Sequence, residues 1–97
     1  MILILSDHAK ARLIQRKFPS NYPELIFNQP DVKYYDNFEK SEISIKSLVY
    51  GNEHRLILIS YIYDLGLKSV IIKTIHPTGQ DQINRYVQNG KWVKRRI

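Results

Sequence analysis

The sequence predicts an α+β domain in which N-terminal helices pack on an antiparallel sheet of about four strands, with a C-terminal helix and a basic tail. The helical signals lie near the two ends of the chain, and segments rich in β-branched and aromatic residues follow one another between them. The chain has 97 residues, which fits one domain and is too short for two. We therefore expect a single domain over residues 1–97.

The N-terminal elements begin with Met1–Leu5, an apolar run that predicts a short buried strand. Ser6 follows as a good helix N-cap, because its hydroxyl can accept a hydrogen bond from the free amides of the next turn. A helix is expected over residues 7–18, and Pro19 ends it. The side chains expected to face the core recur at helical spacing: Ala11, Ile14 and Phe18.

A second short helix, capped by Ser20, is expected over residues 21–28. The middle of the chain alternates Ile, Val, Leu and Tyr with polar residues, which is typical of strands. Gly51–His54 and Asp64–Gly66 supply turns between these strands, so an antiparallel meander is expected. The predicted strands are Val32–Tyr35, Ile43–Tyr50, Leu56–Tyr63 and Val70–His76.

The C-terminal part starts with Thr78, which has Asp81 three residues further on and resembles a helix start. The apolar residues that follow repeat at helical spacing, and Asn89-Gly90 would close this helix through a left-handed C-cap. A hairpin with Asn89-Gly90 at its tip is the alternative for the same residues. The tail from Lys91 to Ile97 can add a last strand.

The chain carries 15 Lys and Arg residues against 9 Asp and Glu residues, a formal charge of +6, and this charge is unevenly distributed. Residues 24–42 hold five acids and two cations, whereas residues 85–97 hold five cations and no acid. This asymmetry predicts one surface for a polyanion and another that faces away from it.

The absence of cysteine excludes disulfides, zinc ribbons and thiol nucleophiles. The histidines and carboxylates show no metal-ligand spacing, and there is no glycine-rich phosphate loop or G-x-S-x-G motif, so we expect no metal and no cofactor. No segment approaches the roughly 20 apolar residues of a membrane span, and the first residues lack the features of a signal peptide. We therefore expect a cytoplasmic protein without a membrane partner.

The strongest catalytic candidates lie on the first helix, where His8, Arg12 and Arg16 recur every four residues and form a polar stripe without an acid. Such a stripe can bind phosphate, and a histidine in it can transfer a proton near neutral pH. The alternative is an ordinary solvated helix face. His76 is the second candidate, because it lies where a strand passes into a helix, a common place for anion sites. A turn histidine that merely caps a strand is the alternative there.

Further candidates would hold RNA. Arg55 opens a strand directly after His54, which we expect to be an exposed loop residue, and Arg55 could point into the same cleft as Arg12. Thr74 and Lys73 are expected on opposite faces of their strand, because side chains alternate along a strand. Tyr86 is the best tyrosine for base stacking. The remaining basic candidates lie near the C-terminus: Arg85, Lys91, Lys94, Arg95 and Arg96.

The chain contains, in order, the motifs Ser6-Asp7-His8-Ala9-x-x-Arg12-x-x-x-Arg16, Asn28-x-Pro30 and Asn89-Gly90-Lys91-Trp92-Val93. Together they resemble a family of small bacterial domains that is similar to the BrnT and RelE toxins and is grouped with the barnase–EndoU–colicin–RelE ribonuclease fold. The resemblance covers nearly the whole chain. It implies an α+β fold, metal-independent RNA cleavage, and often a role as the toxin of a toxin–antitoxin pair. By position, His8, Arg12 and Arg16 match the family's first-helix motif, and Thr74 matches a polar residue on its last sheet strand.

Our hypothesis from the sequence is therefore an endoribonuclease of the toxin class that leaves 2′,3′-cyclic phosphate ends and has a small acidic antitoxin protein as its partner. His8 and His76 would share the acid and base roles, and Arg12, Arg16 and Arg55 would hold the phosphate. The basic tail would steer RNA toward the site. The alternative is a non-catalytic module that binds RNA or a protein through the basic face.

Overall fold

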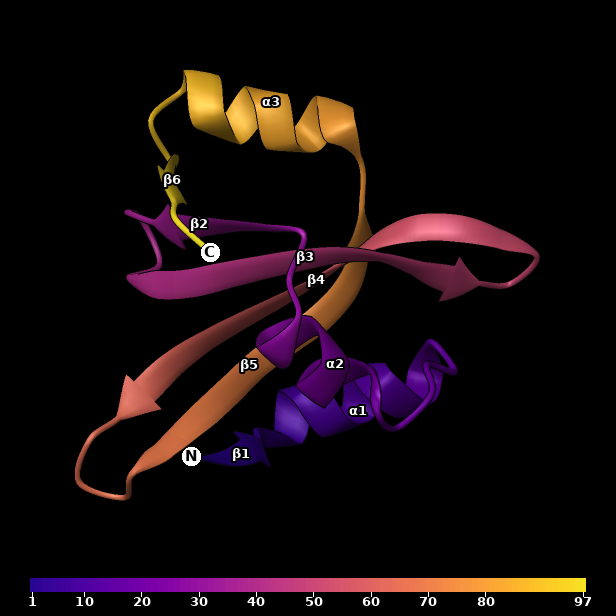
Figure 1. The fold of residues 1–97 in the computed structure, drawn as a ribbon, viewed down its shortest axis with the longest axis vertical. Helices are drawn as coiled ribbons and strands as arrows, with labels where there is room; N and C mark the ends of the chain where they lie inside the picture. Colours follow the sequence, from indigo (N-terminus) through magenta and orange to yellow (C-terminus); the bar gives the residue numbers. More distant parts are fainter.

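In the computed structural model, which describes residues 1–97, six strands form one sheet and three helices pack against it (Figure 1). None of the helices has the length and apolar character needed to cross a membrane. The elements in chain order are β1 (Ile2–Leu5), α1 (Asp7–Gln15), α2 (Tyr22–Asn28), β2 (Val32–Asp36), β3 (Ser41–Tyr50), β4 (Glu53–Asp64), β5 (Ser69–Thr78), α3 (Gln80–Gln88) and β6 (Trp92–Arg95).

The sheet has the strand order β1-β5-β4-β3-β2-β6. Strands β2 to β5 form the antiparallel meander that the sequence predicts, each paired with the next. Two further strands extend the meander: β1 pairs with β5 in parallel, and β6 pairs with β2 in antiparallel fashion. The expectation of an antiparallel sheet of about four strands is therefore wrong in strand number and in the direction of β1. Parallel pairing requires a long connection, which the helices and the meander between β1 and β5 provide.

Strand β1 lies at one edge of the sheet. The prediction of a buried strand is wrong, because β1 is only partly covered. Ile4 is 39% exposed, whereas Leu3 and Leu5 pack against a core. This alternation follows from the period of two of a strand that has only one covered face. On the other face the register places Ile4 beside Ile71, and Ile71 beside Ile62. These three side chains form an apolar row that is partly open to solvent.

The two faces of the sheet carry separate apolar cores. Helices α1 and α2 pack on one face, and α3 packs on the other face near β6; Figure 1 shows α1 and α2 together, far from α3. The larger core consists of Ala9, Phe18, Ile26, Ile57, Ile59, Tyr61, Val70, Ile72 and Ile75. The smaller core consists of Tyr34, Ile43, Ile45, Leu58, Ile83 and Trp92.

The C-terminal segment is helical, which excludes the alternative hairpin. Helix α3 buries Ile83 in the smaller core, and Gly90 follows the helix with a φ of 80°, a left-handed conformation that favours glycine. Gly79, and not Thr78, is the N-cap residue. The Thr78 hydroxyl instead donates a hydrogen bond to Gln82 Oε1 at 2.7 Å, so it still supports the first turn of the helix.

The segment after β1 differs from the prediction at its helix ends. Helix α1 ends at Gln15 and not at residue 18, because Lys17 adopts a left-handed conformation with a φ of 57°. Phe18 is nevertheless buried, with 6% of its surface exposed. Helix α2 has nearly its predicted range, but Asn21 and not Ser20 is its N-cap residue, and no side chain caps it.

The face of α1 that packs on the sheet also differs from the predicted stripe. Ile14 is 76% exposed and Ala11 is exposed, whereas Ala9 and Leu13 pack in the larger core. Apolar spacing alone is compatible with both faces. The Ser6 backbone N–H donates a hydrogen bond to the Ile72 carbonyl of β5 at 3.0 Å, so a contact with a distant segment holds the start of the helix on the sheet.

The contrast between Ser6 and Ser20 yields a stability prediction. Ser6 Oγ accepts a hydrogen bond from the Ala9 amide at 3.1 Å and donates one to the Lys73 carbonyl at 3.1 Å. Ser6→Ala should therefore lower the free energy of unfolding by about 1–2 kcal/mol. Ser20→Ala should change it by less than about 0.5 kcal/mol. Urea unfolding measures both values, and equal effects of the two substitutions would contradict the assignment of Ser6 as the cap.

Candidate functional site

A cavity of about 290 Å³ opens on the sheet face that carries the smaller core, and it is lined by side chains from α1, α3 and the strands between them. Figure 1 shows β5 running from the region of α1 up to the start of α3. Ile43 and Leu58 give the cavity an apolar floor. The other lining residues are His8, Asp36, Glu39, Ser41, Ser60, Lys73, Thr74, His76, Gln82, Tyr86, Lys91 and Trp92.

Strand β5 places two predicted residues in the cavity. Thr74 and His76 are two positions apart and therefore face the same side of the sheet. The register sets them beside Ser60 and Leu58 of β4, respectively. The hydroxyls of Ser60 and Thr74 thus accompany the His76 imidazole on one wall, as hydrogen-bonding groups for an anion.

Lys73 also lines the cavity, because β5 contains a β-bulge. Ser60 pairs with Thr74 and Tyr61 pairs with Ile72, so Lys73 is an extra residue without a partner on β4. A bulge redirects the side chains next to it. The prediction that Lys73 and Thr74 lie on opposite faces is therefore wrong, and the bulge adds a cation to the cavity that regular alternation would exclude.

His8 reaches the cavity from the start of α1. The Ser6 N–H and hydroxyl donate hydrogen bonds to the carbonyls of Ile72 and Lys73. These bonds fix the first turn of α1 against β5 next to the bulge. His8 lies in that turn and lines the cavity together with Lys73 and His76, so two predicted histidines from distant parts of the chain share one site.

His76 is half-buried and lies in a positive environment. Burial lowers the pKa of His76 below its ordinary value of 6.5, and the charges of Arg16, Arg12 and His8 lower it further against the opposing effect of a hydrogen bond. That hydrogen bond joins Nδ1 to the Pro77 carbonyl at 2.9 Å. A carbonyl can only accept, so Nδ1 carries the proton and Nε2 of the neutral ring keeps a free lone pair.

Arg12 and Arg16 lie close enough to His76 to affect its pKa, but they do not line the cavity. Neither forms an ion pair with a carboxylate, since the ion pairs of the structure involve other residues. Arg12 donates one hydrogen bond, to Gln15 Oε1 at 3.3 Å. The two arginines of the predicted stripe are thus unneutralised cations beside the cavity.

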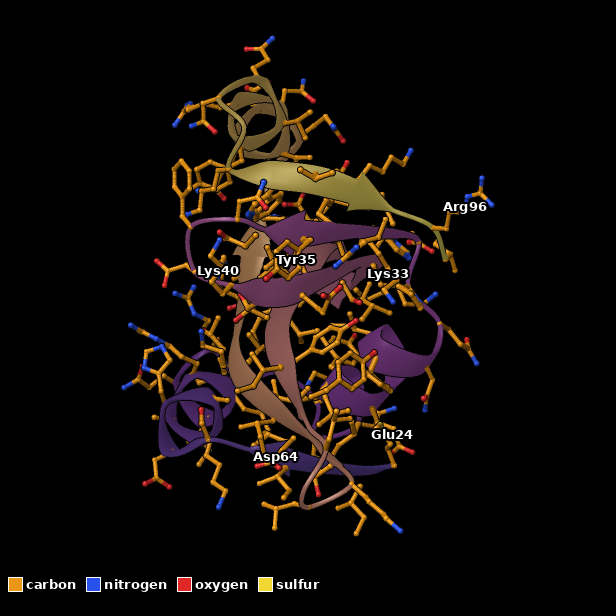
Figure 2. All side chains as sticks on the ribbon, turned by 90° about the vertical axis from the view of Figure 1, so that its left-hand side faces the viewer. Glu24, Lys33, Tyr35, Lys40, Asp64 and Arg96 are labelled. Atoms are coloured by element: carbon orange, nitrogen blue, oxygen red, sulfur yellow. The ribbon has the colours of Figure 1, made fainter.

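The C-terminal cations do not gather at the cavity. Arg85 is exposed outside it, and Arg95 pairs with Glu42 at 3.2 Å on the other face of the sheet. Lys94, Arg95 and Arg96 line a separate hollow, and Figure 2 shows Arg96 projecting beyond the end of β6. The predicted basic residues are therefore divided between this hollow, the cavity, which Lys91 lines, and the exposed surface, where Arg85 lies.

Tyr86 and Lys91 are the two C-terminal candidates that line the cavity, and both are engaged. The Tyr86 ring packs against Trp92 at 4.9 Å between centroids. Lys91 Nζ lies 4.5 Å from the centroid of the Tyr86 ring and 3.7 Å from Asp36 Oδ2. Tyr86 is thus part of an aromatic wall, with less ring surface free for base stacking than the sequence suggested.

Arg55 lies outside the cavity, in a separate hollow with Arg16 and Lys17. It does not share a cleft with Arg12, as the sequence suggested, because Arg12 lines neither this hollow nor the cavity. His54 belongs to β4 and not to a loop, although it is exposed as expected. No group of His, Asp and Glu side chains is arranged to hold a metal ion.

Asp36 and Glu39 also line the cavity, although the sequence did not indicate them as site residues. Asp36 is 3% exposed, and its carboxylate accepts hydrogen bonds from two backbone amides of the following turn and from the Trp92 indole at 3.1 Å. Glu39 is exposed and forms no ion pair. The only local indication of a role for Asp36 in the sequence is that an Asp often precedes a turn. Its hydrogen bond with Trp92 joins residues that are far apart along the chain, so residue spacing does not predict it.

Comparison of the chain with models of known families, with curated proteins and with solved structures finds no match. The α+β class that the motifs imply is the class observed. The resemblance to the BrnT- and RelE-like family stays a prediction from those motifs.

The environment of His76 predicts a loss of stability in mild acid. Because the pKa of His76 is lowered in the folded state, the unfolded chain binds more protons as the pH falls below about 6.5. The contribution of His76 to the free energy of unfolding should be constant above about pH 7 and should decrease as the pH falls toward 5. Urea unfolding at each pH measures this dependence.

Two substitutions isolate the effect of His76. His76→Asn keeps a donor for the Pro77 carbonyl but cannot be protonated, so its stability should decrease less than that of the wild type between about pH 7 and pH 5. His54→Asn, at an exposed site, should follow the wild-type curve. Parallel curves for the wild type and His76→Asn would show that the His76 ring is not held in its neutral form.

Proposed function

We propose that this protein is a metal-independent endoribonuclease that leaves 2′,3′-cyclic phosphate and 5′-hydroxyl ends. The observation that carries the proposal is that His8, Lys73 and His76 line one cavity. Arg12 and Arg16, which form no ion pair, lie near His76. RNA cleavage without a metal needs a base, an acid and positive charge around the phosphate. The residues of this cavity can supply all three.

His76 is suited to the role of base. Its Nδ1–H is held by the Pro77 carbonyl, and burial and the neighbouring arginines favour the neutral ring. In the proposed reaction, Nε2 removes the proton of the 2′-hydroxyl. The 2′-oxygen then attacks the phosphorus and forms a pentacoordinate phosphorane.

His8 is suited to the role of acid, because it lines the same cavity from the exposed start of α1. It donates a proton to the leaving 5′-oxygen as the bond from phosphorus to that oxygen breaks. Lys73 would stabilise the charge on the non-bridging oxygens, and the hydroxyls of Ser60 and Thr74 would donate hydrogen bonds to them. Arg12 and Arg16 add positive potential near His76.

The biological setting that follows from the motifs is that of a toxin with a small acidic antitoxin protein as partner. The net charge of +6 favours an acidic partner. The apolar row of Ile4, Ile71 and Ile62, further along β5 from Lys73, supports a protein partner, because covering such a row removes apolar surface from water. The same row favours the second candidate function, a non-catalytic module that binds a protein.

Cleavage of bulk RNA in the presence of EDTA distinguishes the two candidate functions. The wild type should cut RNA, and products should carry 2′,3′-cyclic phosphate ends. His76→Asn and His8→Ala should each lower the rate by about 10²–10⁴-fold, the usual contribution of a general acid or base. Product ends are identified by mass spectrometry of a defined oligonucleotide.

The control for these variants is His54→Asn, which changes an exposed histidine away from the cavity and should retain the wild-type rate. Circular dichroism of each variant verifies the fold. If the wild type leaves RNA intact, the proposal of an endoribonuclease is wrong and the non-catalytic binding module is favoured. Cleavage that survives both His8→Ala and His76→Asn would show that other residues carry the reaction.

A further inference from the structure

A second hollow, of about 680 Å³, lies where the end of α1 meets the turn between β3 and β4. It is distinct from the cavity that holds His8 and His76. A single aromatic ring accompanies an otherwise polar lining. The lining residues are Arg16, Lys17, Tyr50, Gly51, Asn52, Glu53 and Arg55.

Three cations line this hollow, and none of them is neutralised. Arg16, Lys17 and Arg55 form no ion pair, although Glu53 lines the same hollow. The Arg16 Nε–H is buried and has no hydrogen-bond partner. A buried donor without a partner costs free energy, and an anionic oxygen that reached it would form a charge-assisted hydrogen bond.

The backbone around the hollow is held in place by contacts between the segment after α1 and the end of β3. The Phe18 ring packs against Tyr50 with 4.7 Å between centroids, and Tyr22 Oη donates a hydrogen bond to the Val49 carbonyl at 2.6 Å. Side chains on a fixed backbone lose less conformational entropy on binding. The hollow is therefore preorganised for a ligand.

Arg16 belongs to the hollow and also lies near His76, although it does not line the cavity. It lines the hollow, and it has the largest effect of the charged groups that lower the pKa of His76. His8 lies at the other end of α1, about 12 Å away along the helix axis at 1.5 Å per residue. Arg55, which lines the hollow, directly precedes Leu56, and Leu56 pairs with Thr78, two residues after His76. The hollow therefore lies nearer to His76 than to His8.

We propose that this hollow binds a phosphate of single-stranded RNA on the 5′ side of the cleavage point. The inference rests on the proposed function, in which His76 removes the proton of the 2′-hydroxyl and His8 protonates the leaving 5′-oxygen. The 2′-hydroxyl belongs to the nucleotide on the 5′ side of the scissile phosphate. The part of the RNA that continues from His76 toward Arg16 and Arg55 is thus the 5′ part of the substrate. Arginines suit this role, because a guanidinium can contact two phosphate oxygens at once.

The test compares kcat/KM for three substrates. They are a cleavable dinucleotide, the same dinucleotide with a short 5′ extension, and the same dinucleotide with a short 3′ extension. The 5′ extension should raise kcat/KM about tenfold, as expected for a contact between a phosphate and charged donors. The 3′ extension should have a much smaller effect. The ratio of the extended to the minimal substrate is the quantity compared, because it cancels differences in the amount of folded protein.

Variants of the lining residues assign the gain to the hollow. Lys17→Gln combined with Arg55→Gln should remove most of the gain from the 5′ extension. Glu53→Gln removes the one carboxylate of the hollow and should increase that gain. Lys68→Gln is the matched control, because Lys68 also has a left-handed backbone, with a φ of 51° against 57° for Lys17, but lies in the turn before β5.

The inference would be overturned if the 5′ extension raised kcat/KM in the Lys17→Gln, Arg55→Gln variant as much as in the wild type. It would also be overturned if the 3′ extension raised kcat/KM more than the 5′ extension did. If the wild type cleaves none of the substrates, the proposed function fails. A measurement of RNA binding then tests the proposed phosphate site separately. Fluorescence anisotropy then measures the affinity for a single-stranded oligonucleotide with a 2′-deoxy cleavage position. A loss of about tenfold in the double variant, with a shallower salt dependence, supports a phosphate site. Equal affinity overturns it.

Discussion

Two hydrogen bonds from Ser6 to consecutive carbonyls of β5 hold the start of α1, and with it His8, beside Lys73. They place the first turn of α1 beside the bulge of β5, so that His8 reaches the cavity from that turn. They also direct the helix along β5, so that Arg16 comes to lie near His76 two turns later. Without this attachment the cations of α1 would form an ordinary solvated helix face, which is the alternative that their spacing leaves open.

The features that the sequence predicts well depend on neighbouring residues. Ser6 is recognisable as a cap, Asn89-Gly90 closes α3, and the β2 to β5 meander follows from alternation and turn residues. The histidine and arginine stripe is visible for the same reason. The bulge at Lys73, the rotation of α1 and the parallel pairing of β1 depend on contacts between distant segments. No periodicity within one segment encodes them, so the sequence indicated which residues could act but not that His8, Lys73 and His76 converge.

The distribution of charge in space differs from its distribution along the chain. Arg95 pairs with Glu42, and Lys91 lies 3.7 Å from the buried Asp36 carboxylate, which also accepts the Trp92 indole N–H. The C-terminal cations therefore help to hold β6 against the sheet, and part of their charge is cancelled by the acids of the middle segment. The cations of α1 have no such partners. Positive potential thus remains where the helix borders the cavity, and the unpaired state of these side chains matters more for anion binding than the total of +6.

The position of β1 and α1 also affects the order in which the molecule can fold. The β2 to β5 hairpins join segments that are close along the chain, whereas the bond from Ser6 to Lys73 joins residues 67 positions apart. Closing a longer loop costs more conformational entropy, so contacts of this range form later than local hairpins. A chain in which the meander has formed but α1 is still undocked would hold His76 and Lys73 without His8. The two-histidine cavity is therefore complete only when α1 is docked on β5.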